Sequence, residues 1–256
     1  MTFGIRPPSK AVKYLLIINC VAFLLQLGMR GRLESLFAAS GESPIIALQV
    51  WRLISFQFLH ANPIHLLFNM IGLFFLGRIL EQSWGAKKFL YFYLTCGTVG
   101  GAVFVLASLA GLLSPNYLVG ASGGVLGLLV ACAVLFPQVV VILLLFPVPI
   151  RTAAFLLTAL YVLMILSSGP NAGGNLCHLG GMATAFIWVT GKSYFASWKR
   201  KISKGAYQRQ SDQKQKMQYE VDRILAKVHN QGLQSLTRRE RQILQEATEQ
   251  QKHKNL

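Results

Sequence analysis

Charged residues are scarce in this sequence. They make up 13% of the 256 residues, about half the share in a soluble domain, whereas hydrophobic residues make up 53%. Between Lys88 and Lys192 the only charged side chain is that of Arg151. This composition excludes an ordinary soluble domain and predicts a membrane-embedded body.

Residue patterns for several kinds of site are absent as well. No aspartate precedes Asp212, which excludes catalysis by two aspartates within the membrane body. There is no HExxH pattern, and His60 and His65 are spaced poorly for one metal-binding helical face. The cysteines show no CxxC or paired spacing, so we expect no disulfide framework, metal or cofactor. These cysteines are Cys20, Cys96, Cys132 and Cys177.

Positive charge is concentrated at the end of the chain. Residues 191–256 hold 15 of the 25 Lys and Arg and 6 of the 9 Asp and Glu. A net charge of +16 is a common sign of nucleic-acid binding, but this excess follows the last apolar segment directly. Basic residues in that place are typical of the cytoplasmic face of a membrane, where they attract anionic lipid. We therefore expect a lipid bilayer as a partner and no nucleic acid.

Apolar runs that approach the length of a membrane span occur six times. A transmembrane helix requires about 20 apolar residues. Lys and Arg cluster before the first run, between the second and third, near the start of the fifth and after the sixth. The positive-inside rule assigns these ends to the cytoplasm, so we expect both termini there. The six runs are residues 12–29, 63–80, 88–112, 122–136, 151–167 and 178–196.

The sequence predicts an all-α polytopic membrane protein in three parts. Residues 1–196 are expected to form a bundle of six transmembrane helices, 197–220 a basic polar linker and 221–256 a cytoplasmic helical hairpin. Thr237 followed by Glu240 is a capping-box signature for the second helix of that hairpin. A short N-terminus without a transit-like segment indicates a bacterial plasma membrane.

The few polar side chains in these runs fall at one membrane face. Polar groups inside spans are costly and are therefore functional candidates by default. In the expected orientation the second, fourth and sixth spans all run inward, so their first residues share the extracytoplasmic end. The candidates there are His60, His65, Asn69, Ser122 and His178.

Ser122 and His178 are the residues that a hydrolytic site requires. Alone, Ser122 is more often a small packing residue, and His178 a satisfied histidine at the membrane interface. Together they form the minimum hydrolytic pair, because an imidazole takes the proton that makes a serine hydroxyl nucleophilic. His65 and Asn69 lie four residues apart and face the same way, and an asparagine amide is a suitable oxyanion donor.

Small residues allow the serine and histidine helices to approach. Gly123 and Gly127 on the fourth span, and Gly181 and Ala185 on the sixth, form small-xxx-small faces that permit close backbone contact. Gly120 allows a tight turn into the fourth span, which leaves backbone N–H groups of its first turn free to bind an anion.

Three motifs in this order resemble those of the rhomboid family of intramembrane serine proteases. WRLISFQFLHANPIHLLFNMIG resembles the family's tryptophan–arginine loop and its histidine and asparagine span, GASG its GxSG serine motif, and HLGG its HxxG motif. The resemblance covers residues 45–190. It implies cleavage of transmembrane protein substrates, with a fifth span that acts as a gate. The implied roles are Ser122 as nucleophile, His178 as base, Asn69 and His65 as oxyanion donors, and structural support from Trp51, Arg52, His60, Gly120, Gly123 and Gly181.

Two positions depart from the family pattern. Some members carry an aromatic ring four residues after the serine that stacks on the catalytic histidine, and this position is Leu126. A small residue later in the histidine helix, often glycine, is Ala185. Neither change removes a reacting group, but both concern how the histidine is positioned. The alternative is a non-catalytic rhomboid-like binder or chaperone of membrane proteins, against which the intact Ser122 and His178 argue.

Overall fold

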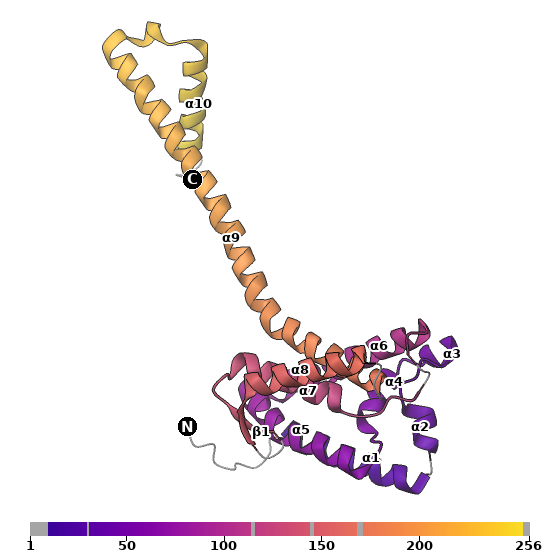
Figure 1. The fold of residues 1–256 in the computed structure, drawn as a ribbon. Helices are drawn as coiled ribbons and strands as arrows, with labels where there is room; N and C mark the ends of the chain where they lie inside the picture. Colours follow the sequence, from indigo (N-terminus) through magenta and orange to yellow (C-terminus); the bar gives the residue numbers. More distant parts are fainter. Residues whose placement is uncertain (1–9, 30, 114–115, 144–145, 168–170, 253–256) are drawn as a thin grey trace. The chain divides into compact units, whose positions relative to one another are not determined.

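The chain divides into two compact units, Met1–Lys192 and Ser193–Leu256. The sequence places this division after residue 196, four residues later. The computed structural model describes residues 10–29, 31–113, 116–143, 146–167 and 171–252 (Figure 1).

Apolar helices form most of the first unit (Figure 1). α1 (Lys10–Met29), α5 (Pro63–Trp84) and α6 (Ala86–Leu109) are long and apolar enough to cross a membrane. α7 (Ser122–Leu135) and α8 (Ile150–Leu166) are apolar but shorter. The described residues are thus mostly helical, with three candidate spans by length and composition, whereas the arrangement of six spans stays a prediction.

The final apolar run begins earlier than the sequence indicates. Its start is expected at His178, but α9 (Ala172–Gln231) begins six residues before it. Gly173 and Gly174 concealed this start, because glycine disfavours a helix. His178 therefore lies in the second turn of α9. α9 also contains the expected linker 197–220, whose Lys, Gln, Arg and Ala residues are good helix formers.

The connection between α1 and α5 consists mainly of short helical pieces. Ala39 in this connection forms an isolated antiparallel bridge with Leu118, which lies just before α7. Backbone hydrogen bonds therefore join the connection to the segment that leads into the serine helix. The pieces are α2 (Arg32–Phe37), α3 (Pro44–Ala47), α4 (Arg52–Ser55) and the 3₁₀ helix η1 (Phe56–Phe58).

A short β-hairpin between α7 and α8 interrupts the otherwise helical fold that the sequence predicts. β1 (Val140–Leu143) pairs antiparallel with β2 (Phe146–Pro149), and Val140 lies opposite Pro149. Pro147 and Pro149 disfavour a helix here, and the β-branched residues of β1 favour an extended chain. The hairpin lets the chain leave α7 and re-enter the bundle at α8.

The core of the first unit lies mainly among α5, α6 and α7. Phe89, Phe92 and Tyr93 of α6 are completely buried in it. The outward faces also carry large apolar side chains: Leu24, Phe68 and Phe155 are 67%, 68% and 72% exposed. A water-facing surface would not tolerate such faces, whereas lipid tails cover them without cost. The chain is therefore an integral membrane protein.

A buried carboxylate joins the start of α1 to the end of α5. Glu81 is 4% exposed and accepts the backbone N–H groups of Ala11 and Val12, each at 2.9 Å. These N–H groups belong to the first turn of α1, which has no intrahelical acceptor for them. Glu81 thus caps a helix that lies 69 and 70 residues before it in the chain.

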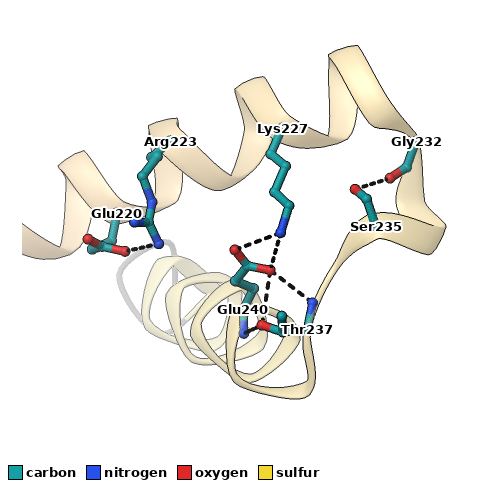
Figure 2. A network of polar contacts seen from close by, with 7 residues as sticks. All are labelled: Glu220, Arg223, Lys227, Gly232, Ser235, Thr237 and Glu240. Atoms are coloured by element: carbon teal, nitrogen blue, oxygen red, sulfur yellow. Dashed lines mark hydrogen bonds and ion pairs between the residues drawn. The ribbon is translucent and has the colours of Figure 1, made fainter.

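The second unit ends in a helical hairpin. The chain turns at Gly232, whose φ is 76°, and continues through η2 (Leu233–Ser235) into α10 (Arg238–Lys252). Lys227 near the end of α9 forms an ion pair with Glu240 of α10 at 2.9 Å (Figure 2). Ile224 is completely buried in this hairpin.

The capping box expected at the start of α10 is confirmed (Figure 2). The backbone N–H of Thr237 donates to Oε2 of Glu240 at 2.8 Å, and the backbone N–H of Glu240 donates to Oγ1 of Thr237 at 3.3 Å. The backbone bond from Thr237, followed by the side-chain bond from Lys227, lowers the pKa of Glu240 to about 2.

This lowered pKa predicts that the hairpin weakens in acid. A carboxyl whose folded pKa is below its unfolded value of 4.5 stabilises the fold above pH 4.5, and this contribution is lost as pH falls toward 2. We expect the NMR amide signals of α10 in the full-length protein to be lost at lower temperature at about pH 2.5 than at about pH 6. Glu240→Gln should abolish most of this difference. Glu220→Gln, which removes an exposed ion pair with Arg223, is the control and should leave the difference unchanged.

Candidate active site

Ser122 and His178 lie within hydrogen-bond distance although they are 56 residues apart in the sequence. Oγ of Ser122, the first residue of α7, is 2.7 Å from Nε2 of His178 on α9. This is the separation that proton transfer from a hydroxyl to an imidazole requires. The two side chains belong to the first unit and are partly shielded from solvent.

Close packing of α7 on α9 makes this distance possible. A Cβ atom on Gly181 would lie only 2.8 Å from the carbonyl carbon of Gly123 and even nearer to its oxygen. Real Cβ atoms do not approach backbone atoms so closely, so any side chain at Gly181 would push the helices apart. Gly127 continues this contact, since a Cβ on it would lie 3.4 Å from the carbonyl oxygen of Gly181.

A constrained turn sets the position of Ser122. Gly120 has a φ of 128°, a backbone conformation that residues other than glycine rarely adopt. Its N–H donates to the carbonyl of Phe56 at 3.0 Å. A Cβ on Gly120 would lie 2.7 Å from Cε1 of His65 and 3.6 Å from Oγ of Ser122. Gly120 is therefore the residue that lets the His65 ring approach the serine.

Arg52 organises the connection that supports this turn. Its buried guanidinium donates through Nη1 to the carbonyl of Ala38 at 2.8 Å and through Nη2 to the carbonyl of Ser35 at 2.6 Å. The next residue, Ala39, exchanges two backbone hydrogen bonds with Leu118, at 3.1 and 2.8 Å. Arg52 thus acts on the serine turn through two intervening backbone segments.

Trp51 lies at the outer side of the same connection. Its side chain is 52% exposed, and Nε1 donates to the carbonyl of Leu36 at 3.3 Å. The indole therefore anchors α2 to the start of α4 and takes no part in the contacts around Ser122 that the structure describes.

The two expected oxyanion donors differ in their surroundings. The ring of His65 packs against Gly120 next to Ser122. Asn69 is 4% exposed, and its Nδ2 donates to the carbonyl of His65 at 2.9 Å within α5. One N–H of the amide remains for a second acceptor, because the side chain carries two.

The ring of His60 packs against that of His65. The backbone of His60 exchanges hydrogen bonds with the side chain of Gln26 on α1, at 2.8 and 3.2 Å, and its ring meets that of His65 edge-on with centroids 5.2 Å apart. Burial, aided by the nearby His65, lowers the pKa of His60 to about 4, so this ring is neutral at neutral pH. A neutral, buried His60 is a packing partner for His65.

Tyr161 is a neighbour of the site that the sequence reasoning missed. Its ring lies against that of His178, with centroids 4.6 Å apart and planes inclined by 59°. Tyr161 belongs to α8, and no motif distinguishes it from the other large apolar residues of that helix. Only the packing of α8 against α9 places it at the site.

Among the described residues, Ser122 and His178 are not joined by an acidic residue that would complete a catalytic triad. The described residues contain no cluster of three or more His, Cys, Asp or Glu side chains that could hold a metal. Nδ1 of His178 is buried and has no hydrogen-bond partner among them. The arrangement is therefore a dyad, suited to attack on a carbonyl by an activated serine.

Comparisons with known proteins relate both units to described families. The family model of the rhomboid domain matches residues 47–195, and that of a family of unknown function (DUF6576) matches residues 208–250. RHOMBOID-like protein 2 of Arabidopsis thaliana is 33% identical over 190 residues, covering 68% of this chain and 56% of that protein. Rhomboid protease GluP of Bacillus subtilis is 36% identical over 111 residues, covering 42% of this chain and 20% of that protein. The chain thus spans about half the length of the first relative and a fifth of the second.

The contact at Gly181 predicts that a single methyl group there impairs the dyad. Gly181→Ala should move α9 away from α7 and lengthen the contact between Ser122 and His178. A misplacement of about 1 Å can cost on the order of 100-fold in rate, so we expect a loss of that order in the labelling of Ser122 by a fluorophosphonate. Gly191→Ala on the same helix is the control, because a Cβ there meets nothing within 4 Å. Equal labelling rates in the two variants would contradict this account of the helix contact.

Proposed function

This chain belongs to the rhomboid family, and on that premise we propose that it is an intramembrane serine endopeptidase. It hydrolyses peptide bonds in or near the transmembrane segments of other membrane proteins. The observation that carries the proposal is the 2.7 Å contact between Oγ of Ser122 and Nε2 of His178. A family member without catalytic activity would have no need to keep this pair aligned.

The reaction begins with the serine hydroxyl. His178 takes the proton of Ser122 at Nε2 while Oγ attacks the carbonyl carbon of the substrate peptide. The protonated His178 then gives this proton to the leaving amine, and an acyl-enzyme ester remains on Ser122. Water, deprotonated in turn by His178, hydrolyses the ester and restores the dyad.

The negative oxygen of the tetrahedral intermediate needs donors close to Ser122. The backbone N–H of Ser122 is available, because it belongs to the first turn of α7, which no side chain in the described part of the chain caps. His65 reaches the same place past Gly120, and Asn69 supplies the N–H of its amide that is not bonded to the carbonyl of His65. Donors fixed in advance stabilise such an oxygen without reorganisation.

The substrate must expose a peptide carbonyl that a regular helix keeps hydrogen-bonded. A transmembrane segment therefore has to unwind locally before attack, which favours segments with weak helical propensity near the membrane surface. In the six-span arrangement with both termini in the cytoplasm, Ser122 lies near the extracytoplasmic surface, where water is available for the second step.

Two alanine variants test the dyad. Ser122→Ala and His178→Ala should each reduce cleavage of a model transmembrane substrate in liposomes to background, because each removes a group that takes part in bond making. The proteins should still express and insert, since neither side chain is large. Robust cleavage by either purified variant would refute the assignment.

A serine-reactive probe separates this function from its alternative. A fluorophosphonate should label the wild-type protein and leave Ser122→Ala unlabelled, because labelling requires an activated serine. A non-catalytic binder of membrane proteins would bind substrates but would not be labelled.

A third variant tests the oxyanion donors. Asn69→Ala should lower kcat by about 100- to 1000-fold, the usual cost of one such donor, with a smaller change in KM. The matched variant Asn19→Ala removes a buried amide of α1 that bonds its own helix in the same way. Asn69 has only a structural role if both variants lower activity equally.

A further inference from the structure

Tyr161 contacts the ring of His178, and few other contacts fix the orientation of that ring. The centroid distance of 4.6 Å lies in the range of favourable aromatic pairs. Nε2 of His178 faces Ser122, and Nδ1 has no hydrogen-bond partner among the residues that the structure describes. In a serine protease triad a carboxylate on this second nitrogen fixes the imidazole. Here the orientation of the ring depends on packing.

The serine helix does not supply the required packing surface. Leu126 lies four residues after Ser122 and therefore on the same face of α7. A leucine side chain has no flat surface on which an imidazole can stack. The aromatic ring in contact with His178 comes instead from α8, a different element.

Tyr161 lies on the face of α8 that is turned toward the protein. The buried residues of α8 all lie at its start: Ile150, Ala153 and Ala154. In the rest of the helix Tyr161 and Leu157 are partly buried and pack against the core, whereas Leu163 is 63% exposed. Tyr161 thus turns inward in a half of α8 that is otherwise loosely packed.

We infer that Tyr161 is a positioning residue, whose ring holds the imidazole of His178 so that Nε2 faces Oγ of Ser122. This inference rests on the proposed function. The ring of Tyr161 takes the place of a stacking ring that Leu126 cannot provide. The position of α8 is then part of the catalytic geometry. The competing explanation is that Tyr161 only fills space between α8 and α9.

Substitutions at two positions separate these explanations. Tyr161→Phe keeps the ring, Tyr161→Ala and Tyr161→Leu remove it, and Leu126→Phe in the Tyr161→Ala background returns a ring from α7. Leu163→Ala on the lipid-facing side of α8 is the control. Each full-length protein is measured in liposomes for kcat and KM on a model transmembrane substrate and for the rate of fluorophosphonate labelling at Ser122.

Positioning predicts a loss in the chemical step. Tyr161→Phe and the control should stay within about threefold of wild type, whereas Tyr161→Ala and Tyr161→Leu should lose about 10- to 100-fold in kcat and labelling rate with little change in KM. Leu126→Phe should recover most of the loss in Tyr161→Ala. Tyr161→Leu decides the question if Tyr161→Ala does not fold, because leucine retains most of the packing volume.

Two results in the variants would overturn the inference. The first is a wild-type labelling rate in folded Tyr161→Leu. The second is a loss of kcat and labelling rate in the Tyr161 variants that is proportional to the loss of folded protein. Failure of the proposed function is distinguishable, because it is seen in the wild type itself. An unlabelled wild type refutes both the proposed function and the inference, whereas a wild type that is labelled at Ser122 but cleaves no membrane protein refutes only the proposed function. The labelling rates of the variants would still decide the role of Tyr161.

Discussion

The contact between the backbones of α7 and α9 is the constraint on which the site depends. Helix axes usually lie about 8–10 Å apart, a separation that is set by the side chains at the contact. Gly123 and Gly181 remove the side chains that would keep the two helices at that separation. Since lipid tails are as apolar as the helices, close packing of small residues takes the place of the hydrophobic effect as the force that holds them together. The same glycines thus serve both the association of the helices and the contact between Ser122 and His178.

Because Ser122 is the first residue of its helix, its position also depends on the turn that precedes it. The connection between α1 and α5 holds this turn through a sequence of backbone contacts. Arg52 donates to the carbonyl of Ala38, the adjacent Ala39 pairs with Leu118, and the N–H of Gly120 donates to the carbonyl of Phe56. Together these bonds leave the turn before Ser122 little freedom. Such preorganisation lowers the cost of reaching the reactive geometry.

The parts of this structure that local sequence determines were predictable. The start of α7 at Ser122 follows from a glycine-rich turn before an apolar run, and the capping box of α10 from two residues three apart. Contacts between distant segments left no such signal. Glu81 is an isolated acid in the sequence, and only the packing of α1 on α5 brings the start of α1 to it. Tyr161 is likewise one large residue in a helix of many, because the side of α8 that faces the protein depends on its neighbours.

Three charged residues of the membrane body act as hydrogen-bond partners for backbone groups. Glu81 accepts N–H groups at the start of α1, and Arg151 donates to the carbonyl of Ala133 near the end of α7 at 3.2 Å, where helices lack partners of their own. Arg52 is also buried against carbonyls, although it lies in the connection that the proposed orientation places outside the cell. The positive-inside rule concerns charges that resist transfer across the membrane because water or lipid headgroups solvate them. A guanidinium enclosed by protein carbonyls is a weak indicator of topology, so Arg52 is weak evidence against cytoplasmic termini.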